Sequence, residues 1–215
     1  YLDGQEVNRE PAKIMSTRIF DIVNSYFDVA AKLPLSTQVT LQDGAVGDLT
    51  DGIEGALDLI STCHNAGGTV RFIGNGGSAT IASHMAVDLS KRANVRALAM
   101  NDGGMLTCLS NDLGYDQVFS HQLTLHGKSD DLLFAISSSG ESMNIINGCR
   151  AASKCESHIV TLSGFRSDNH LRTFGEINFF VESLEYGFVE LTHMAILSAI
   201  SDIFIGWHPD QSADR

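Results

Sequence analysis

The sequence is poor in positive charge and contains no long apolar run, and each shortage excludes a class of protein. Fourteen Lys and Arg stand against 26 Asp and Glu, which gives a net charge of −12. This balance argues against binding to a nucleic-acid backbone. No apolar run approaches the roughly 20 residues of a membrane span, and residues 1–6 do not resemble a signal peptide. We therefore predict a cytoplasmic protein that binds neither nucleic acid nor membrane.

The cysteines are few and lack the spacing of a metal site. The four of them are Cys63, Cys108, Cys149 and Cys155, and no pair has CxxC spacing. They are typical of reduced, mostly structural thiols, and a zinc site made of cysteines is not indicated. The 215 residues suffice for one sizeable α/β core, or for one domain with an extension.

Helical and strand patterns alternate along most of the chain. Helical periodicity covers residues 11–35 and 48–65, separated by a polar stretch at 36–48. Strands are then expected at 69–74, 95–100, 131–136, 157–162 and 177–181, with helices at 78–91, 142–154 and 188–206. Strands separated by helices indicate parallel βαβ crossovers. The predicted fold is α/β, a flavodoxin-like doubly wound sheet of five parallel strands with two N-terminal helices.

The two leading helices suggest how the chain is organised. Their apolar faces are larger than one small sheet can cover, so a subunit interface is their natural use. We expect residues 1–66 to form a helical extension for oligomerisation. Residues 67–207 would form the α/β domain, packed as one unit with these helices.

A cluster of serines follows the third expected strand. Ser137, Ser138, Ser139 and Ser142 surround Gly140 and lead into a helix. Free backbone N–H groups and the positive end of the helix dipole attract anions there. The loop has no Lys and no Walker pattern, so a phosphate monoester on a small polyol fits better than a nucleotide. The alternative, a simple N-cap, needs only one Ser.

A second loop of this kind follows the first expected strand. It contains Asn75, Gly76, Gly77 and Ser78, and its glycines let the backbone approach a ligand. A plain tight turn also uses such residues. Because ligands of doubly wound sheets bind beyond the carboxyl ends of the strands, both loops are expected to converge on one polar ligand.

Two of the expected helices carry further candidate catalytic or metal-binding residues. His84 and Asp88 share one helix face, which suits two metal ligands or a base with its partner, but also an exposed His–Asp pair or a core His satisfied by a carboxylate. On the last helix, Glu190, His193 and Ser198 lie broadly on one side among apolar neighbours. A buried carboxylate or imidazole is costly unless it is paired or functional, and both interpretations remain open.

Polar residues also follow the second expected strand. Asp102, Asn111 and Asp112 follow this strand, at the edge of the sheet where the hydroxyl groups of a sugar would bind. The stretch that begins at Asn101 is equally compatible with a turn that ends in a helix N-cap.

Four segments together resemble the sugar isomerase (SIS) domain family, and within it the phosphoheptose isomerases. They are GNGGSATIASHMAVDL (74–89), NDLGY (111–115), AISSSGESMNI (135–145) and VELTHMAILSAISD (189–202). The resemblance covers about residues 10–206. It implies interconversion of sedoheptulose 7-phosphate and an aldoheptose phosphate, with phosphate in the serine loop. It also implies that Asn75 and Ser78 line the sugar, that no nucleotide cofactor is used, and that a homotetramer shares its active sites.

The chain departs from the family in the catalytic half. His84 matches, but Asp88 replaces a Glu that serves as base and metal ligand. Glu190 replaces a Gln, Ser198 replaces a His that completes catalysis and zinc binding, and Gly187 and Phe188 replace an Asp and an Arg. We expect His84, Asp88 and Glu190 to be the catalytic residues and to hold a divalent metal, of which zinc fits best.

Three functions are compatible with these residues. The first is an aldose–ketose isomerase that acts through an enediol or enediolate. The second is a non-catalytic phosphosugar-binding or partner-binding protein, like the branch of the family that binds the replication initiator. Ser198 favours this second function, whereas the ionisable His84 and Glu190 oppose it. The third is a lyase or deaminase acting on amino-sugar phosphates, although the extra motifs of those groups are absent.

Overall fold

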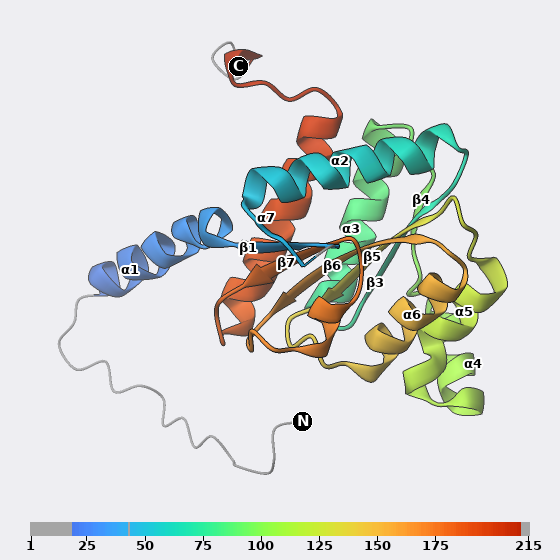
Figure 1. The fold of residues 1–215 in the computed structure, drawn as a ribbon. Helices are drawn as coiled ribbons and strands as arrows, with labels where there is room; N and C mark the ends of the chain where they lie inside the picture. Colours follow the sequence, from blue (N-terminus) through green and yellow to red (C-terminus); the bar gives the residue numbers. More distant parts are fainter. Residues whose placement is uncertain (1–18, 43, 212–215) are drawn as a thin grey trace, which may run out of the picture.

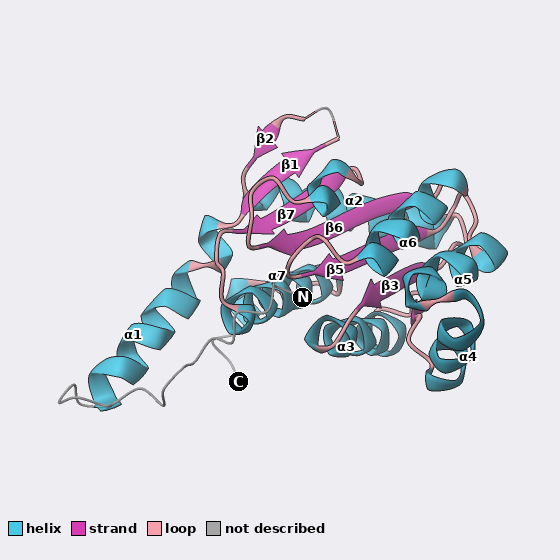
Figure 2. Ribbon diagram, turned by 90° about the horizontal axis from the view of Figure 1, so that it is seen from below, coloured by secondary structure: helices cyan, strands magenta, loops and turns pink. Residues whose placement is uncertain are grey.

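The protein is built around one mixed sheet. The computed structural model describes residues 19–42 and 44–211, so the expectations for residues 1–6 and for a helix beginning at residue 11 lie wholly or partly outside the described residues. The sheet has seven strands in the order β2-β1-β7-β6-β5-β3-β4 (Figure 2). The strands are β1 Gln38–Leu41, β2 Val46–Gly47, β3 Val70–Gly74, β4 Ala97–Ala99, β5 Leu132–Ser137, β6 His158–Gly164 and β7 Ile177–Val181.

Five of these strands are parallel and confirm the expected fold. Their order, β4-β3-β5-β6-β7, is that of a flavodoxin-like doubly wound sheet. The other two correct the prediction that residues 36–48 form only a polar connection. They make a hairpin that extends the sheet, with β1 antiparallel to β7. Val39 is fully buried and pairs with Phe179, because alternate side chains of this short strand reach the core.

Helices cover both faces of the sheet. Helices α2, α3 and α7 lie on one face, and α4, α5 and α6 lie on the other (Figure 1). Their bounds are α1 Ile19–Lys32, α2 Leu49–Asn65, α3 Gly77–Arg92, α4 Gly103–Leu113, α5 Val118–His126, α6 Met143–Lys154 and α7 Tyr186–Phe204. Short 3-10 helices are η1 Pro34–Ser36, η2 Tyr115–Gln117, η3 His170–Thr173 and η4 Pro209–Gln211. Sequence reasoning assigned no helix between residues 101 and 130, and therefore missed α4 and α5.

The two N-terminal helices differ in what they contact. Helix α2 starts at a capping box between Asp48 and Asp51 and buries one side against the sheet, including Ala56 and Ile60. Helix α1 has no buried residue and extends away from the rest of the chain (Figure 1). Its exposed apolar residues are Ile19, Phe20, Ile22, Val23, Tyr26, Phe27 and Val29. Thus α2 belongs to the core, whereas α1 leaves an apolar stripe uncovered.

Helix α7 is long and apolar enough to cross a membrane, judged by length and composition alone. It is the one described helix that meets this criterion, with 19 residues and a mean hydropathy of 1.3 over its best window. The inner face of the helix is nevertheless part of the core, where Val189, Ile196 and Ile200 are almost fully buried. Packing against the sheet and α3 accounts for the apolar residues of this inner face.

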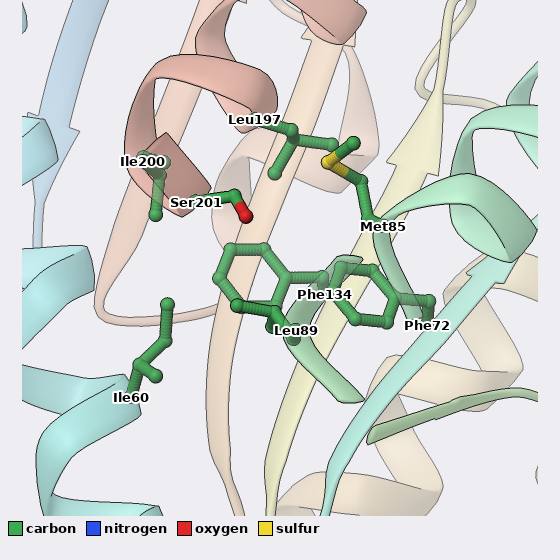
Figure 3. A pocket seen from close by; sticks show the side chains of 8 residues that line it. All are labelled: Ile60, Phe72, Met85, Leu89, Phe134, Leu197, Ile200 and Ser201. Atoms are coloured by element: carbon green, nitrogen blue, oxygen red, sulfur yellow. The ribbon is translucent and has the colours of Figure 1, made fainter. Parts of the chain in front are cut away.

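A small cavity lies between α2, α3, α7 and the sheet. Its volume is about 10 Å³, and seven of its eight lining residues are apolar (Figure 3). The exception is Ser201, whose buried hydroxyl has no hydrogen-bond partner among the residues described. Figure 3 shows this hydroxyl among apolar side chains such as Phe134 and Leu197. Such a group is a small local cost to stability.

All four cysteines are free thiols, as expected. Burial raises the pKa of Cys63 to about 11 and the pKa of Cys149 to about 12. Both therefore stay protonated and unreactive at neutral pH, which suits a purely structural role.

Candidate functional site

The serine and glycine loops meet where the strand order reverses. Strands β3 and β5 are neighbours in the sheet, but the chain leaves β3 for β4 on one side and leaves β5 for β6 on the other. This switch point is where doubly wound sheets bind their ligands. A pocket of about 210 Å³ opens there, lined by Asn75, Gly76, Gly77, Ser78, Ile136, Ser137, Ser138, Ser139, Ser142, Tyr186 and Glu190. The structure thus brings together both predicted loops and one carboxylate from the last helix.

The serine loop presents a donor that no protein group uses. Ser137 Oγ accepts a hydrogen bond from the backbone N–H of Gly140, and Ser139 Oγ accepts one from Glu141, both at 3.2 Å. Ser138 is only 4% exposed, and its Oγ has no partner within the described chain. Because it lines the pocket, this hydroxyl is positioned for a polar ligand.

The same loop ends in an open helix terminus. Ser142 is the N-cap of α6, and its side chain makes no capping hydrogen bond. The N–H of Ile145 donates to Asn144 Oδ1 at 3.0 Å, but among the described residues no side chain accepts from the N–H groups of Met143 and Asn144, which carry the positive end of the helix dipole. Together with Ser138, this terminus forms an anion-binding arrangement.

A second segment holds the serine loop from behind. Gly140 has φ +66°, and its Cα lies directly against the side chain of Asn169. The N–H of Leu171 donates to the carbonyl oxygen of Gly140 at 3.0 Å, and the N–H of His170 donates to the Glu141 carboxylate at 3.0 Å. The loop is therefore fixed in shape before any ligand arrives.

The glycine loop is ordered by amide side chains. Gly76, with φ +53°, is the N-cap of α3. Asn75 and Asn144 exchange two hydrogen bonds of 2.9 and 2.8 Å through their side-chain amides. The hydroxyl of Tyr115 donates to Asn75 Oδ1 at 3.0 Å. These contacts link the glycine loop to α6 and fix the amide of Asn75 at the edge of the pocket.

Glu190 reaches the pocket from α7. Its half-buried carboxylate lies directly over Gly77, where a Cβ would come within 2.5 Å of Glu190 Cδ. Gly77 is the first residue of α3, so the carboxylate sits at the positive end of that helix. No Lys or Arg is among the described residues that line the pocket, and Glu190 is its one charged side chain.

His84 and Asp88 lie elsewhere on α3. His84 follows Gly77 by seven residues, which is roughly 10 Å along the helix axis, and Asp88 is one turn further. His84 Nε2 and Asp88 Oδ2 are 3.4 Å apart, and the His84 side chain is 52% exposed. The arrangement is that of a His–Asp pair at the surface of α3, one of the alternatives that the sequence left open. Throughout the described residues, no three His, Cys, Asp or Glu side chains form a group able to hold a metal, so His84, Asp88 and Glu190 do not come together in one chain.

The polar residues after β4 do not reach the pocket either. Asp102 is the N-cap of α4 and accepts a hydrogen bond from the N–H of Met105 at 2.9 Å, as the alternative interpretation anticipated. Asn111 donates to Asp112 at 2.8 Å, and both are exposed on the same helix. Because these residues follow β4 in the sequence, we expected them near the end of that strand, but α4 carries Asn111 and Asp112 away from it.

His193 and Ser198, on α7, take no part in the lining of the pocket. His193 is fully buried, and its Nε2 lies 3.1 Å from the carbonyl oxygen of Ser163, so the ring is a donor through Nε2. Burial lowers the pKa of His193 to about 4, and the ring is neutral at pH 7. Ser198 is partly buried, two turns beyond Glu190. His193 therefore has a structural role, as a buried neutral side chain that donates to a backbone carbonyl oxygen.

Sequence reasoning missed several residues around the pocket. Tyr186 lines it four residues before Glu190, on the same helix face, so the helical spacing contained a signal for it. Asn144 and Asn169 position the two loops from helices and turns that are remote in sequence. No local pattern indicates such long-range partners.

Comparisons with known proteins agree with this geometry. A family model described as SIS domain matches residues 37–164, which is more than half of the chain. The phosphoheptose isomerase of Dechloromonas aromatica is 31% identical over 81% of this chain and 92% of its own length. That of Rhodospirillum rubrum is 36% identical over 55% of this chain, and the match spans 66% of the relative, just under two thirds.

A solved structure extends the likeness to three dimensions. The structure of a phosphoheptose isomerase from Francisella tularensis superposes with a TM-score of 0.75 at 28% identity, covering 87% of this chain and 98% of that one. The family model, the relatives and the shared arrangement of strands give one conclusion: the chain belongs to the SIS domain family.

Proposed function

We propose that the protein is a phosphosugar aldose–ketose isomerase that acts on sedoheptulose 7-phosphate. One observation carries the proposal: a buried, unpartnered hydroxyl of an anion-binding loop, Ser138, and a carboxylate, Glu190, line the same pocket. An isomerase of this kind needs an anchor for phosphate and a base near the reacting carbons. The names of the relatives, phosphoheptose isomerase, support the same assignment.

The phosphate binds at the start of α6. The N–H groups of this helix and the hydroxyl of Ser138 donate to its oxygens, while Ser137 and Ser139 keep the loop in shape through their bonds to backbone N–H groups. The carbon chain of the sugar then extends toward the glycine loop and Glu190. The phosphate supplies binding energy at a distance from the chemistry and positions the reacting carbons.

Glu190 is the base that moves the proton. Its carboxylate takes a proton from C1 of the ketose, and the electrons of that C–H bond form the C1–C2 double bond of an enediolate, with negative charge on O2. The protonated Glu190 returns the proton to C2, while the hydroxyl proton passes from O1 to O2 as the aldehyde forms. The Tyr186 hydroxyl lines the same pocket and can donate to these oxygens.

The residues of a single chain do not fit the expected zinc ion. His84 and Asp88 pair with each other on the surface of α3, and Glu190 lies at the other end of that helix. Their donor atoms cannot surround one ion, so no step of the reaction is assigned to a metal. Asp88, which with Glu190 was one of the two expected candidates for the base, is not among the residues that line the pocket.

Hydrogen exchange tests the assignment of the base. The parent protein is incubated with sedoheptulose 7-phosphate in deuterated solvent, and NMR follows loss of the C1 proton signal. Exchange should occur in the parent and in Asp88→Asn and should vanish in Glu190→Gln, which keeps the shape of the side chain. Loss of exchange in Asp88→Asn with retention in Glu190→Gln would contradict the proposed base.

A binding protein without turnover is the second candidate. It is favoured by the scarcity of acid–base groups, since Glu190 and Tyr186 are the ionisable side chains among the described residues of the pocket. Calorimetric binding of sedoheptulose 7-phosphate without any exchange of its C1 proton in the parent would support this candidate. It would also remove the isomerase assignment.

We further propose that the protein forms a homotetramer through α1. Most of the apolar stripe of this helix is exposed: the ring of Tyr26 packs on Phe188 of α7, with 4.6 Å between the ring centroids, but Phe20 and Phe27 are more than 60% exposed. Changing both to Asp should dissociate the assembly in light scattering, because it places charge in an apolar interface. Ser25→Asp, on the opposite side of α1, is the matched control, and a monomeric parent would contradict the proposal.

A further inference from the structure

The pocket joins two helix termini of the same kind. Helix α3 starts after Gly76 and α6 starts after Ser142, and neither of these N-cap residues makes a side-chain capping hydrogen bond. Each terminus presents positive potential to the pocket. By this criterion alone, the pocket would accept two anionic groups, one at each end of a short ligand.

The two termini differ in what already occupies them. The Glu190 carboxylate packs on Gly77, at the start of α3, so the protein itself supplies a negative charge there. The start of α6 instead shares the pocket with Ser138, which is 4% exposed and whose hydroxyl has no partner in the described chain. One terminus is neutralised by the protein and the other is free to bind an anion.

No positive charge in the described pocket offsets Glu190. A second phosphate or carboxylate on the ligand would meet the Glu190 carboxylate without a Lys or Arg to separate them. Like charges brought together in a partly desolvated site are strongly unfavourable. Hydroxyl groups of a sugar, in contrast, can donate to that carboxylate.

We infer that Glu190 is a specificity-determining residue that restricts the pocket to ligands with a single anionic group, held at the serine loop. Sugar monophosphates are accepted, and sugar bisphosphates or phosphorylated sugar acids are rejected. The inference rests on the proposed function for the place of the phosphate. The inference goes beyond the proposed function because it assigns to Glu190 a selectivity between ligands that is separate from its role in proton transfer.

Calorimetric titration with two probes tests the inference. Sedoheptulose 7-phosphate and sedoheptulose 1,7-bisphosphate are titrated into the parent chain, Glu190→Gln and Glu185→Gln. The parent should bind the monophosphate roughly 10- to 100-fold more tightly than the bisphosphate. Glu190→Gln should reduce this ratio of affinities, mainly by increasing the affinity for the bisphosphate. Glu185→Gln, at the N-cap of α7 but outside the pocket lining, should leave the ratio unchanged.

The outcomes separate this inference from the proposed function. Equal affinity of the parent for both probes, or a ratio that Glu190→Gln does not change, would overturn the selectivity while leaving the monophosphate site intact. Absence of binding of both probes would overturn the phosphate site and this inference with it. Glu190→Ser serves as a second neutral variant should Glu190→Gln fail to fold, as judged by circular dichroism.

Discussion

The turns after β3 and β5 are nearly equivalent in sequence and different in the folded chain. Both are rich in glycine or serine, and both end at a helix N-terminus. The turn after β5 is held from behind by Asn169 and Leu171 and keeps a free hydroxyl in the pocket. The turn after β3 is held by Asn144 and is covered by the Glu190 carboxylate.

The difference comes from segments that are remote in sequence. The 3-10 helix η3 and the residue before it support the serine loop, whereas α7 delivers a charge to the glycine loop. A local motif therefore identifies a backbone able to bind an anion, and the tertiary neighbours decide whether an anion binds there. Of the four predictions below, two test the turn after β5 and two test the packing of α7, the helix that delivers Glu190.

The largest effect is expected from Gly140→Ala. The left-handed backbone at φ +66° disfavours a Cβ, which would also collide with Asn169 Oδ1. We expect a loss of about 3–5 kcal/mol in the free energy of unfolding, the sum of strain and overpacking, and loss of phosphosugar binding. Chemical denaturation and calorimetry measure the two.

Gly67→Ala is the matched control for Gly140→Ala. Gly67 has φ +74°, but a Cβ there would meet no atom within 4 Å. It should cost only about 1–2 kcal/mol, from backbone strain alone, and leave binding intact. Equal costs for the two variants would show that contact with Asn169 does not hold the serine loop.

Lowering the pH should weaken the packing of α7. Because the pKa of His193 is about 4 in the folded chain and 6.5 as a model value, the unfolded chain gains the proton first as the pH falls. The contribution to stability is fully present above pH 6.5 and is lost toward pH 4. Its maximum is on the order of 3 kcal/mol.

Denaturation at a series of pH values measures this dependence. His193→Gln can still donate to Ser163 but does not titrate, so its free energy of unfolding should fall less steeply than that of the parent between pH 6.5 and 4. The exposed His64→Gln serves as control and should follow the parent. Identical slopes for the parent and His193→Gln would contradict the assignment.

Ser138→Ala should weaken phosphosugar binding without lowering the stability of the free protein. Its hydroxyl bonds no described protein group, so the free protein should keep or slightly increase its stability. Affinity for sedoheptulose 7-phosphate should fall by about 1–3 kcal/mol, the cost of an under-bonded charged acceptor. Unchanged affinity in calorimetry would place the phosphate elsewhere.

The smallest effect is expected from Ser201→Ala, on the side of the molecule where α7 packs. Removal of an unpartnered buried hydroxyl from an apolar cavity should raise the free energy of unfolding by up to about 1 kcal/mol. Ser61→Ala, whose hydroxyl donates to Leu57 within α2, should instead be neutral or destabilising. Thermal denaturation compares the two variants, and a destabilised Ser201→Ala would argue against an unsatisfied hydroxyl.

Local patterns predicted most of the parallel sheet and both loops of the pocket. Strand β5 is an apolar run up to Ser137, β3 is apolar except for Arg71, and the helix starts carry their own turn residues. The hairpin of β1 and β2 was missed because its strands are short and because β1 pairs with β7, some 140 residues away in the chain. The metal set was drawn from the spacing of His84 and Asp88 on one helix and, for Glu190, from the family resemblance. Neither determines where along one helix the other crosses it. The contact of Glu190 with Gly77, rather than with Asp88, is such a crossing.

The contact between Gly77 and Glu190 also has an evolutionary consequence. Any side chain at position 77 would displace the carboxylate from the start of α3, because even a Cβ falls within 2.5 Å of it. The two positions are therefore not free to vary independently. In related sequences, an Ala or Ser at the position of Gly77 should be accompanied by a shorter or neutral residue at the position of Glu190, and the paired change should alter which ligands the pocket accepts.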